Sequence, residues 1–303
     1  MAVTAGMVKE LREKTSAGMM DCKKALQENN GDMEAAIDWL RTKGIAKADK
    51  KASRVAAEGL VGMKVEGAKG ALVEVNSETD FVSRNDAFQA AVQEIADKAV
   101  EVGSTDELAA ATLGSTGKSV TDSMKDLVGT IGENMNFRRM EKLEVGDGVV
   151  VGYMHNQVAP GMGKIGVLVG LEGSADKATM EDLAKKIAMH VAATAPLALS
   201  VDELDQDVVA KEREMLKAEA LESGKPEAIV DKMVDGRMQK FFKESVLLTQ
   251  IFVMDGENTI EQVVKNAGDV KLVGYKRMAL GEGIEKEDGP DFAAEVAAMS
   301  KGG

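Results

Sequence analysis

The sequence contains few residues that covalent or metal chemistry could use. It has one cysteine and two histidines among 303 residues. The single cysteine, Cys22, cannot form an intramolecular disulfide and cannot build a cysteine metal site by itself. His155 and His190 are far apart in the sequence, and neither has a second histidine at the spacing of metal ligands. We therefore expect no bound metal and no cofactor.

Aromatic residues and long apolar runs are also scarce. Aromatic side chains make up 3% of the sequence, whereas methionine occurs 19 times, so small side chains and methionine must fill much of the core. No apolar run reaches the roughly 18 residues of a membrane span. The first residues lack the apolar core of a signal peptide. The expectation is a cytoplasmic protein that does not bind membranes.

The charge balance is strongly negative. The formal net charge is −13, and a surface of that sign is repelled by phosphate backbones, which argues against direct binding of nucleic acid. The basic segment 43–54 is the local exception, and we interpret it as a solvated linker. With 44% hydrophobic and 29% charged residues, the chain is typical of a globular protein, and its length favours two or three domains.

Helical spacing dominates the first forty residues. Three short apolar stripes, separated by TSAG (15–18) and NNGD (29–32), predict three short helices. A bundle of this size buries little surface, so it needs a partner or a neighbouring domain. The stripes consist of Met7, Val8 and Leu11, then Met19, Cys22, Ala25 and Leu26, then Met33, Ala36, Ile37 and Leu40.

A hairpin followed by a helix occurs twice after this bundle. Alternation of apolar and polar residues predicts a β-hairpin over 59–78 and a second one, with a longer turn, over 149–173. A helix from Asn85, with Phe88, Val92, Ile95 and Ala99 facing inward, follows the first hairpin, and a helix over 174–193 follows the second. Aligning 70–75 with 166–171 also brings Ile95 near Ile187 and leaves the first copy four residues longer before its helix. We interpret this pattern as an internal duplication.

The remaining segments predict a helical hairpin and a short α/β tail. SVDE (200–203) has the form of a capping box, and the turn SGKP (223–226) separates two apolar stripes. Segment 245–254 is strand-like, 259–268 predicts a short helix, 269–280 a last strand, and a terminal helix begins near Asp291. The stripes consist of Leu204, Val208, Met215 and Leu216, then Ile229, Met233, Val234, Phe241 and Phe242.

No set of residues predicts catalysis. His190 lies in the apolar segment IAMHVAA and is interpreted as a packed core residue, whereas His155, at a hairpin tip, is the better candidate for a contact. GMGKIG (161–166) lacks the spacing of a phosphate-binding loop and lies inside a hairpin. The residues therefore indicate a non-enzymatic protein that works through protein contacts.

Phe81 is the unusual residue of the polar run SETDFVSRND (77–86). It lies in the connection that is longer in the first copy, and loops on a rigid scaffold often carry function. Two interpretations are open. Either the ring reaches a partner, or it packs into the core, as most lone aromatic residues do.

Four stretches, in order along the whole chain, resemble bacterial elongation factor Ts. The opening 7–59 and the motif TDFV (79–82) are the most specific of these. The quoted sequences are MVKELREKTSAGMMDCKKALQENNGDMEAAIDWLRTKGIAKADKKASRVAAEG (7–59), VNSETDFVSRNDAF (75–88), IAMHVAA (187–193) and GEGIEKEDGPDFAAEVAAM (281–299).

The resemblance implies an α+β fold and a guanine-nucleotide exchange factor for elongation factor Tu, in its GDP-bound and nucleotide-free forms. It also implies that Phe81 inserts into the partner near its Mg²⁺ and phosphate site, with Asp80 beside the ion. Thr79 and Val82 would shape the loop, and His155 is a further candidate contact. The helical hairpin is a candidate surface for homodimerisation.

The implied modules follow the chain in order. They are a ubiquitin-associated-like three-helix domain (1–54), a core N-subdomain (55–140), a core C-subdomain (141–195 and 243–277), an inserted coiled-coil hairpin (196–242) and a C-terminal module (278–303). The alternative is a non-catalytic adaptor or chaperone that binds partners through the N-terminal bundle. An enzyme with an unrecognised acid–base site is a weaker alternative, because no cluster of residues supports it.

Overall fold

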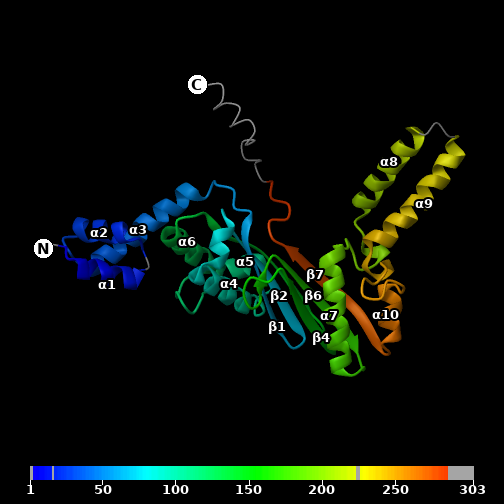
Figure 1. The fold of residues 1–303 in the computed structure, drawn as a ribbon, viewed down its shortest axis with the longest axis horizontal. Helices are drawn as coiled ribbons and strands as arrows, with labels where there is room; N and C mark the ends of the chain where they lie inside the picture. Colours follow the sequence, from blue (N-terminus) through cyan, green and yellow to red (C-terminus); the bar gives the residue numbers. More distant parts are fainter. Residues whose placement is uncertain (1–2, 16, 223–225, 286–303) are drawn as a thin grey trace.

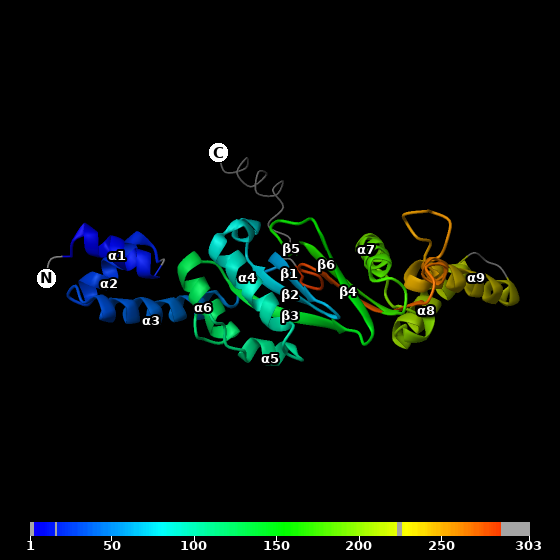
Figure 2. The ribbon, with the colours of Figure 1, turned by 90° about the horizontal axis from the view of Figure 1, so that it is seen from below.

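The computed structural model describes residues 3–15, 17–222 and 226–285. Across these residues the fold is α+β, with ten α-helices and two small antiparallel sheets, which confirms the predicted class. The molecule is elongated. A helical bundle lies at one end, the sheets and their helices lie in the middle, and a helical hairpin projects at the other end (Figure 1, Figure 2).

The predicted N-terminal bundle is present, and its third helix is longer than expected. Leu11, Cys22 and Leu26 are fully buried between the helices, and the Asp32 carboxylate caps the third helix by accepting a hydrogen bond from the Ala35 N–H at 3.0 Å. The helices are α1 (Ala5–Thr15), α2 (Met19–Glu28) and α3 (Met33–Lys51). The interpretation of segment 43–54 as a linker was wrong, since most of it continues α3. The helix continues because no proline interrupts this segment and because its glycine packs against another helix.

That glycine, Gly44, lies where α3 crosses α6 (Val120–Ile131). A Cβ added to Gly129 of α6 would lie only 2.9 Å from the Gly44 Cα, so the two helices touch backbone to backbone. Beyond the crossing, the Lys51 ammonium donates to the Gly132 carbonyl, which accepts at the end of α6. The bundle is thus attached to the core through α3 and its contact with α6.

The first sheet contains the predicted hairpin 59–78 as its two central strands. The four inward residues predicted for the following helix are all fully buried, and the Asn85 side chain caps that helix by accepting from the N–H groups of Ala87 and Phe88. The strand order is β3-β2-β1-β5. The elements are β1 (Glu58–Glu66), β2 (Lys69–Ser77), α4 (Asp86–Ala99), α5 (Thr105–Ala110), β3 (Met135–Glu144) and β5 (Met162–Gly163).

The second sheet repeats this plan. It contains the predicted second hairpin, whose long turn supplies β5 to the first sheet. The strand order is β4-β6-β7, and α7 packs on the sheet as α4 packs on the first. The elements are β4 (Gly148–His155), β6 (Ile165–Gly173), α7 (Lys177–Thr194), α10 (Ile260–Asn266) and β7 (Val270–Ala279).

The two units share a detail that supports the duplication. In each unit, the register shifts where a central strand pairs with the last strand of the unit. The shift lies between Glu74 and Val75 in β2, which pairs with β3, and between Gly170 and Leu171 in β6, which pairs with β7. These positions coincide in the alignment of 70–75 with 166–171. The connections differ, because residues 78–85 join β2 to α4 whereas only 174–176 join β6 to α7. The extra chain of the first unit carries the TDFV motif.

The inserted helical hairpin is formed by α8 (Gln206–Glu222) and α9 (Glu227–Ser245). The predicted capping box was wrong, since Ser200 precedes the short 3₁₀ helix Val201–Glu203 and α8 starts later. Most of the predicted turn (223–225) is outside the described residues. The predicted stripes were partly wrong, because three of their members are exposed and other residues fill the interface. Val208, Met215 and Ile229 are exposed. Leu216 and Val234 are buried as predicted, and Ala220, Val230 and Met238 are the other buried residues of the interface.

The segment 245–254, predicted as a strand, forms no strand. It continues from the end of α9 into a 3₁₀ turn (Leu247–Thr249), and Val246 pairs only through one isolated bridge to Ala198. The Gln250 side chain turns inward and lies 2.9 Å from His190, which is fully buried as predicted. The predictions for 259–268 and 269–280 are confirmed by α10 and β7. The terminal helix predicted near Asp291 is outside the described residues.

Two of the predicted module boundaries fall inside strands. The boundary at residue 140 lies within β3, and the boundary at residue 277 lies within β7. The module boundaries themselves stay predictions. None of the described helices has both the length and the apolar character that a membrane span requires.

Glu74 is the one Asp, Glu, Lys or Arg residue that is buried within the described chain. It lies in β2, and its carboxylate accepts hydrogen bonds from Arg138, from Arg139 Nε at 2.6 Å and from the Gly281 N–H at 2.8 Å, in addition to the Asn76 amide. Burial would raise the pKa of Glu74, but these donors together hold it below its ordinary value. The carboxylate thereby joins β2 and β3 to the chain just after β7.

Replacing Gly129 by alanine is expected to destabilise the α3–α6 contact by about 1–3 kcal/mol, since two backbones must move apart to admit the methyl group. Gly236→Ala is the matched control. A Cβ at Gly236, in α9, meets nothing within 4 Å, so this change is expected to stabilise by up to about 1 kcal/mol. Urea unfolding followed by circular dichroism measures both. Equal midpoints for Gly129→Ala and wild type would contradict the tight crossing.

Replacing Glu74 by glutamine is expected to destabilise the fold by about 3 kcal/mol near neutral pH, because the arginines lose their buried counter-charge. The folded pKa is lowered, so the carboxylate contributes fully above its unfolded pKa of about 4.3, and the contribution is lost as the pH falls through the folded pKa. The difference in unfolding free energy between the two proteins should therefore shrink on acidification. A difference that stays constant down to pH 3 would rule out this charge compensation.

Candidate functional site

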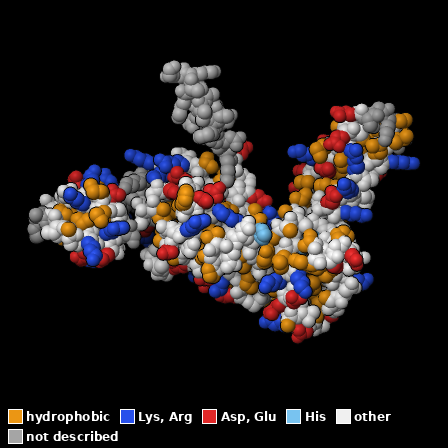
Figure 3. Space-filling view, in the orientation of Figure 1, with side chains coloured by type: hydrophobic (Ala, Val, Ile, Leu, Met, Phe, Trp, Pro, Cys, Tyr) orange, Lys and Arg blue, Asp and Glu red, His pale blue; other side chains and the backbone are white. Residues whose placement is uncertain are grey.

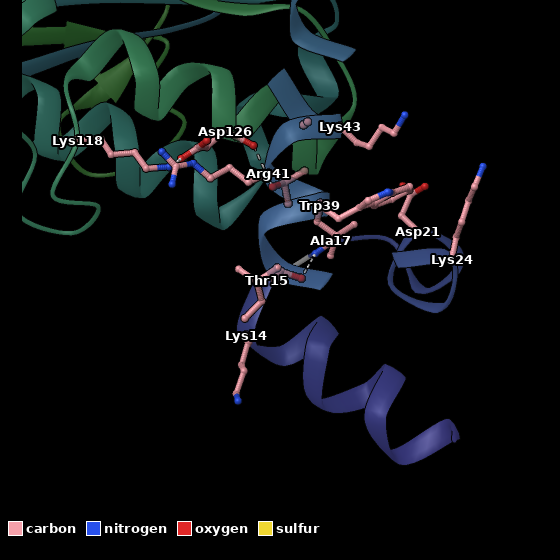
Figure 4. Close-up of a pocket in the computed structure, with 15 residues that line it drawn as sticks. Lys14, Thr15, Ala17, Asp21, Lys24, Trp39, Arg41, Lys43, Lys118 and Asp126 are labelled. Atoms are coloured by element: carbon pink, nitrogen blue, oxygen red, sulfur yellow. Dashed lines mark hydrogen bonds and ion pairs between the residues drawn. The ribbon is translucent and has the colours of Figure 1, made fainter. Parts of the chain in front are cut away.

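The described residues contain no group of three or more His, Cys, Asp or Glu side chains that could hold a metal ion. A hollow of about 430 Å³ lies between the N-terminal bundle and α6, and several lysines line it. Figure 4 shows that the end of Lys14 points in the opposite direction to the ends of Lys24 and Lys43, and Lys118 pairs with Asp126. Charged groups that do not converge give the hollow no geometry for catalysis.

The connection between β2 and α4 is a short loop with a fixed backbone. At its start, the Ser77 hydroxyl donates to the Thr79 carbonyl at 2.8 Å. At its end, the Ser83 carbonyl accepts a hydrogen bond from the Gln89 side chain of α4, also at 2.8 Å, and Asn85 caps that helix. Between these anchors, Asp80–Arg84 forms one 3₁₀ turn. Hydrogen bonds within the loop and to α4 therefore anchor both of its ends.

Phe81 and Val82, which are neighbours in this turn, point in opposite directions. Val82 is 4% exposed and belongs to the core cluster of the first unit, whereas Phe81 is 79% exposed. The core interpretation of Phe81 is therefore wrong. An exposed ring of this size has no packing role in the isolated chain. The ring is therefore available for contact with another molecule.

Asp80 lies beside this ring. Its side chain is exposed and makes no hydrogen bond or ion pair with any residue that the structure describes. The exposed ring offers an apolar contact surface. The free carboxylate beside it can accept hydrogen bonds from water, including water bound to a cation. The two chemically different groups are presented together on one turn.

Thr79 is held by a residue that the sequence did not reveal. Its N–H donates to Glu133 Oε2 at 2.9 Å, and its hydroxyl donates to Glu133 Oε1 at 2.8 Å. Glu133 comes from the chain between α6 and β3. The glycine that ends α6, Gly132, signals a helix end in the sequence, but nothing local shows that the next residue reaches back to Thr79.

His155 lies at the end of β4 and is exposed, 3.1 Å from the Tyr153 hydroxyl through its Nδ1. Its carbonyl accepts from the Lys164 N–H at 3.3 Å, and the Lys164 ammonium lies 3.3 Å from Glu58, which pairs with Ser77. His155 therefore lies at the same end of the core as the loop. No contact joins it to residues 79–82, so its role stays a prediction.

Phe81→Ala is expected to leave the free energy of unfolding within about 0.5 kcal/mol of wild type, because the ring is exposed. Val82→Ala, one residue along, is expected to cost about 2 kcal/mol, because it removes buried methyl groups from the core. Urea unfolding monitored by circular dichroism measures the pair. Similar losses for the two variants would mean that the ring packs on the fold after all.

Comparison with known proteins places this architecture. Residues 78–282 match the family model described as elongation factor TS. The chain is 57% identical over 306 residues to elongation factor Ts of Parvibaculum lavamentivorans and to that of Rhizobium etli, with 99% of both chains covered in each case. It is 56% identical over 308 residues to elongation factor Ts of Sinorhizobium medicae, with both chains covered completely. The exposed Phe81 loop and the duplicated core are thus features of a chain that belongs to the elongation factor Ts family.

Proposed function

We propose that this protein is a guanine-nucleotide exchange factor that binds elongation factor Tu and promotes the release of GDP during translation elongation. Membership in the family supports this function. The structural observation that carries it is the 79% exposed Phe81 ring on a loop with a fixed backbone. A ring that contributes nothing to the fold's core is available for insertion into a partner.

Exchange of a nucleotide requires no covalent step. A GTPase holds its nucleotide with a phosphate-binding loop and Mg²⁺. A protein that binds the empty form more tightly than the GDP form must weaken GDP binding by the same factor, because linkage is reciprocal. Shifting a two-state equilibrium from 1:99 to 99:1 requires about 5.5 kcal/mol of differential binding. A broad interface supplies this energy, and the loop directs it to the nucleotide site.

Within this proposal, the residues of the loop have separate roles. The Phe81 ring enters the partner and displaces groups that hold Mg²⁺ and the β-phosphate. Asp80 perturbs the water around the ion through its charge and hydrogen bonding. Thr79 and Val82 fix the loop, through Glu133 and the core respectively. His155, at the same end of the core, is a candidate for a further contact.

The proposed partners follow from the same surface. The protein acts without catalysing a covalent reaction, without a cofactor and in the cytoplasm, and it binds elongation factor Tu in its GDP-bound and nucleotide-free forms. Neither nucleic acid nor a membrane is a partner in this proposal, which agrees with the net charge of −13. The proposal also includes a homodimer through the helical hairpin, which the exposed Val208, Met215 and Ile229 support.

A second candidate is an adaptor or chaperone that uses the N-terminal bundle. Met19 and Met20 are 59% and 74% exposed there, beside a hollow of about 460 Å³ that Val3 and Val8 also line. Apolar side chains are visible on the surface of this bundle in Figure 3. Flexible methionines suit contacts with a protein surface. This bundle can grip the same partner, so the exchange proposal includes it.

The decisive test is GDP release from elongation factor Tu. We expect the protein to accelerate release of a fluorescent GDP in stopped flow, and we expect Phe81→Ala to lose most of that acceleration while it keeps the wild-type fold. Val253→Ala, which trims a 49% exposed side chain before α10, is the control for loss of exposed apolar surface and should behave as wild type.

Three outcomes separate the alternatives. Acceleration that depends on Phe81 supports the exchange proposal and its loop. Acceleration that Phe81→Ala does not change keeps the function but moves the mechanism to the wider interface. No acceleration by the folded wild-type protein contradicts exchange and favours the adaptor.

A further inference from the structure

We infer that Glu133 is a positioning residue for exchange: it fixes the Asp80–Phe81 turn at the end of the core nearest the N-terminal bundle. This inference rests on the proposed function. Both oxygens of the Glu133 carboxylate are engaged by Thr79, one by its N–H at 2.9 Å and the other by its hydroxyl at 2.8 Å. Hydrogen bonds to a charged acceptor are stronger than those between neutral groups.

The Phe81 ring depends on this contact because it has little support of its own. It is 79% exposed, so its place is set by the backbone of the turn. On one side of the ring, Val82 anchors the turn in the core. On the other side, the anchor is Thr79, two residues before the ring. Without Glu133 the Thr79 N–H has only water to pair with, and on that side the turn keeps the Ser77 hydroxyl on the Thr79 carbonyl but loses both bonds to the segment after α6.

Glu133 itself is fixed by its neighbours. Gly132 ends α6 with φ +93°, in the left-handed region, and this turn sends the chain back toward β2. The Asn134 N–H donates to Glu78 Oε1, and the Asn134 side chain donates to the Arg54 carbonyl at 2.7 Å. The carboxylate thus projects from a segment that is anchored on both sides.

The same segment joins the loop to the N-terminal bundle. Lys51, in the last turn of α3, donates to the Gly132 carbonyl, and Arg54 lies 3.2 Å from Glu78. Residues 132–134 are therefore bonded both to the end of the helix that carries the bundle and to the residues that begin the loop. A partner that binds the bundle meets the ring at a defined distance and orientation.

The test separates positioning from binding. In a titration of elongation factor Tu·GDP release, Glu133→Ala should lower the rate at saturating concentration by about tenfold or more, because a small displacement of an acting group can cost up to about a hundredfold. The half-saturating concentration should change less than twofold, because the rest of the interface stays intact. A general structural defect would raise the half-saturating concentration as well.

Variants of Thr79, the residue that Glu133 holds, make the test more specific. Thr79→Val removes only the hydroxyl bond and should lower the saturating rate by less than Glu133→Ala. Thr79→Ser restores a hydroxyl and should recover the rate lost in Thr79→Val. The double variant Glu133→Ala with Thr79→Val should lose no more than Glu133→Ala alone, because both changes remove the same hydroxyl bond.

The chain offers a matched control. Glu94 makes the same pair of bonds elsewhere in the first unit, since it accepts from both the N–H and the hydroxyl of Ser115. Glu94→Ala should leave the rate at wild type, and urea unfolding should give Glu94→Ala and Glu133→Ala similar stabilities.

A saturating rate of Glu133→Ala equal to that of wild type overturns the inference, as does additivity of the Glu133 and Thr79 losses. If the wild-type protein itself fails to accelerate release, the proposed function fails instead.

Discussion

The buried charge of Glu74 constrains how the two halves of the core can be joined. A carboxylate that is removed from water is stable only if donors replace the water, and Glu74 finds them on three segments. Arg138 and Arg139 come from β3, and the Gly281 N–H comes from the chain just after β7. The first unit therefore cannot keep this charge satisfied unless the end of the second unit lies against it. An apolar residue at position 74 would not require the two units to pack in this way.

This constraint extends along β2 to the loop. Glu74 is three residues before Ser77, whose hydroxyl begins the hydrogen bonding of the loop. Glu78 and Thr79 then pair with the chain after α6, so the loop is bonded to the strand before it and to a segment 54 residues away. At the position equivalent to Glu74, the second unit has Gly170, and its connection to the helix is short. Only the first unit combines a buried anchor with a long connection, which explains why one copy of the duplication carries the exposed ring.

The sequence predicted elements whose causes are local. Both hairpins, the inward face of α4 and the short helix over 259–268 were predicted from local sequence patterns, and the structure has them. The wrong predictions fall where contacts between residues far apart in the sequence determine the local structure. Segment 245–254 has the composition of a strand, but the buried His190 draws Gln250 inward and the chain turns there. In segment 43–54 the sequence shows a basic, glycine-containing stretch, and the helix persists because Gly44 meets Gly129. The exposure of Phe81 was one of two open interpretations. Glu133 was missed entirely, because its bonds to Thr79 span 54 residues.

The elongated shape gives these local contacts their importance for the proposed exchange function. The N-terminal bundle and the loop are separate surfaces, and in the proposed function both contact elongation factor Tu. When two surfaces are rigidly joined, binding at one raises the effective concentration of the other at its site, provided that the spacing fits. Here the joint consists of the glycine crossing of α3 on α6, the Lys51–Gly132 bond and the Arg54–Glu78 pair. A flexible joint would let the bundle hold a partner while the ring stayed outside it, and binding would then proceed without exchange. Within the proposed function, rigidity between the bundle and the ring is therefore what couples binding of the partner to nucleotide exchange.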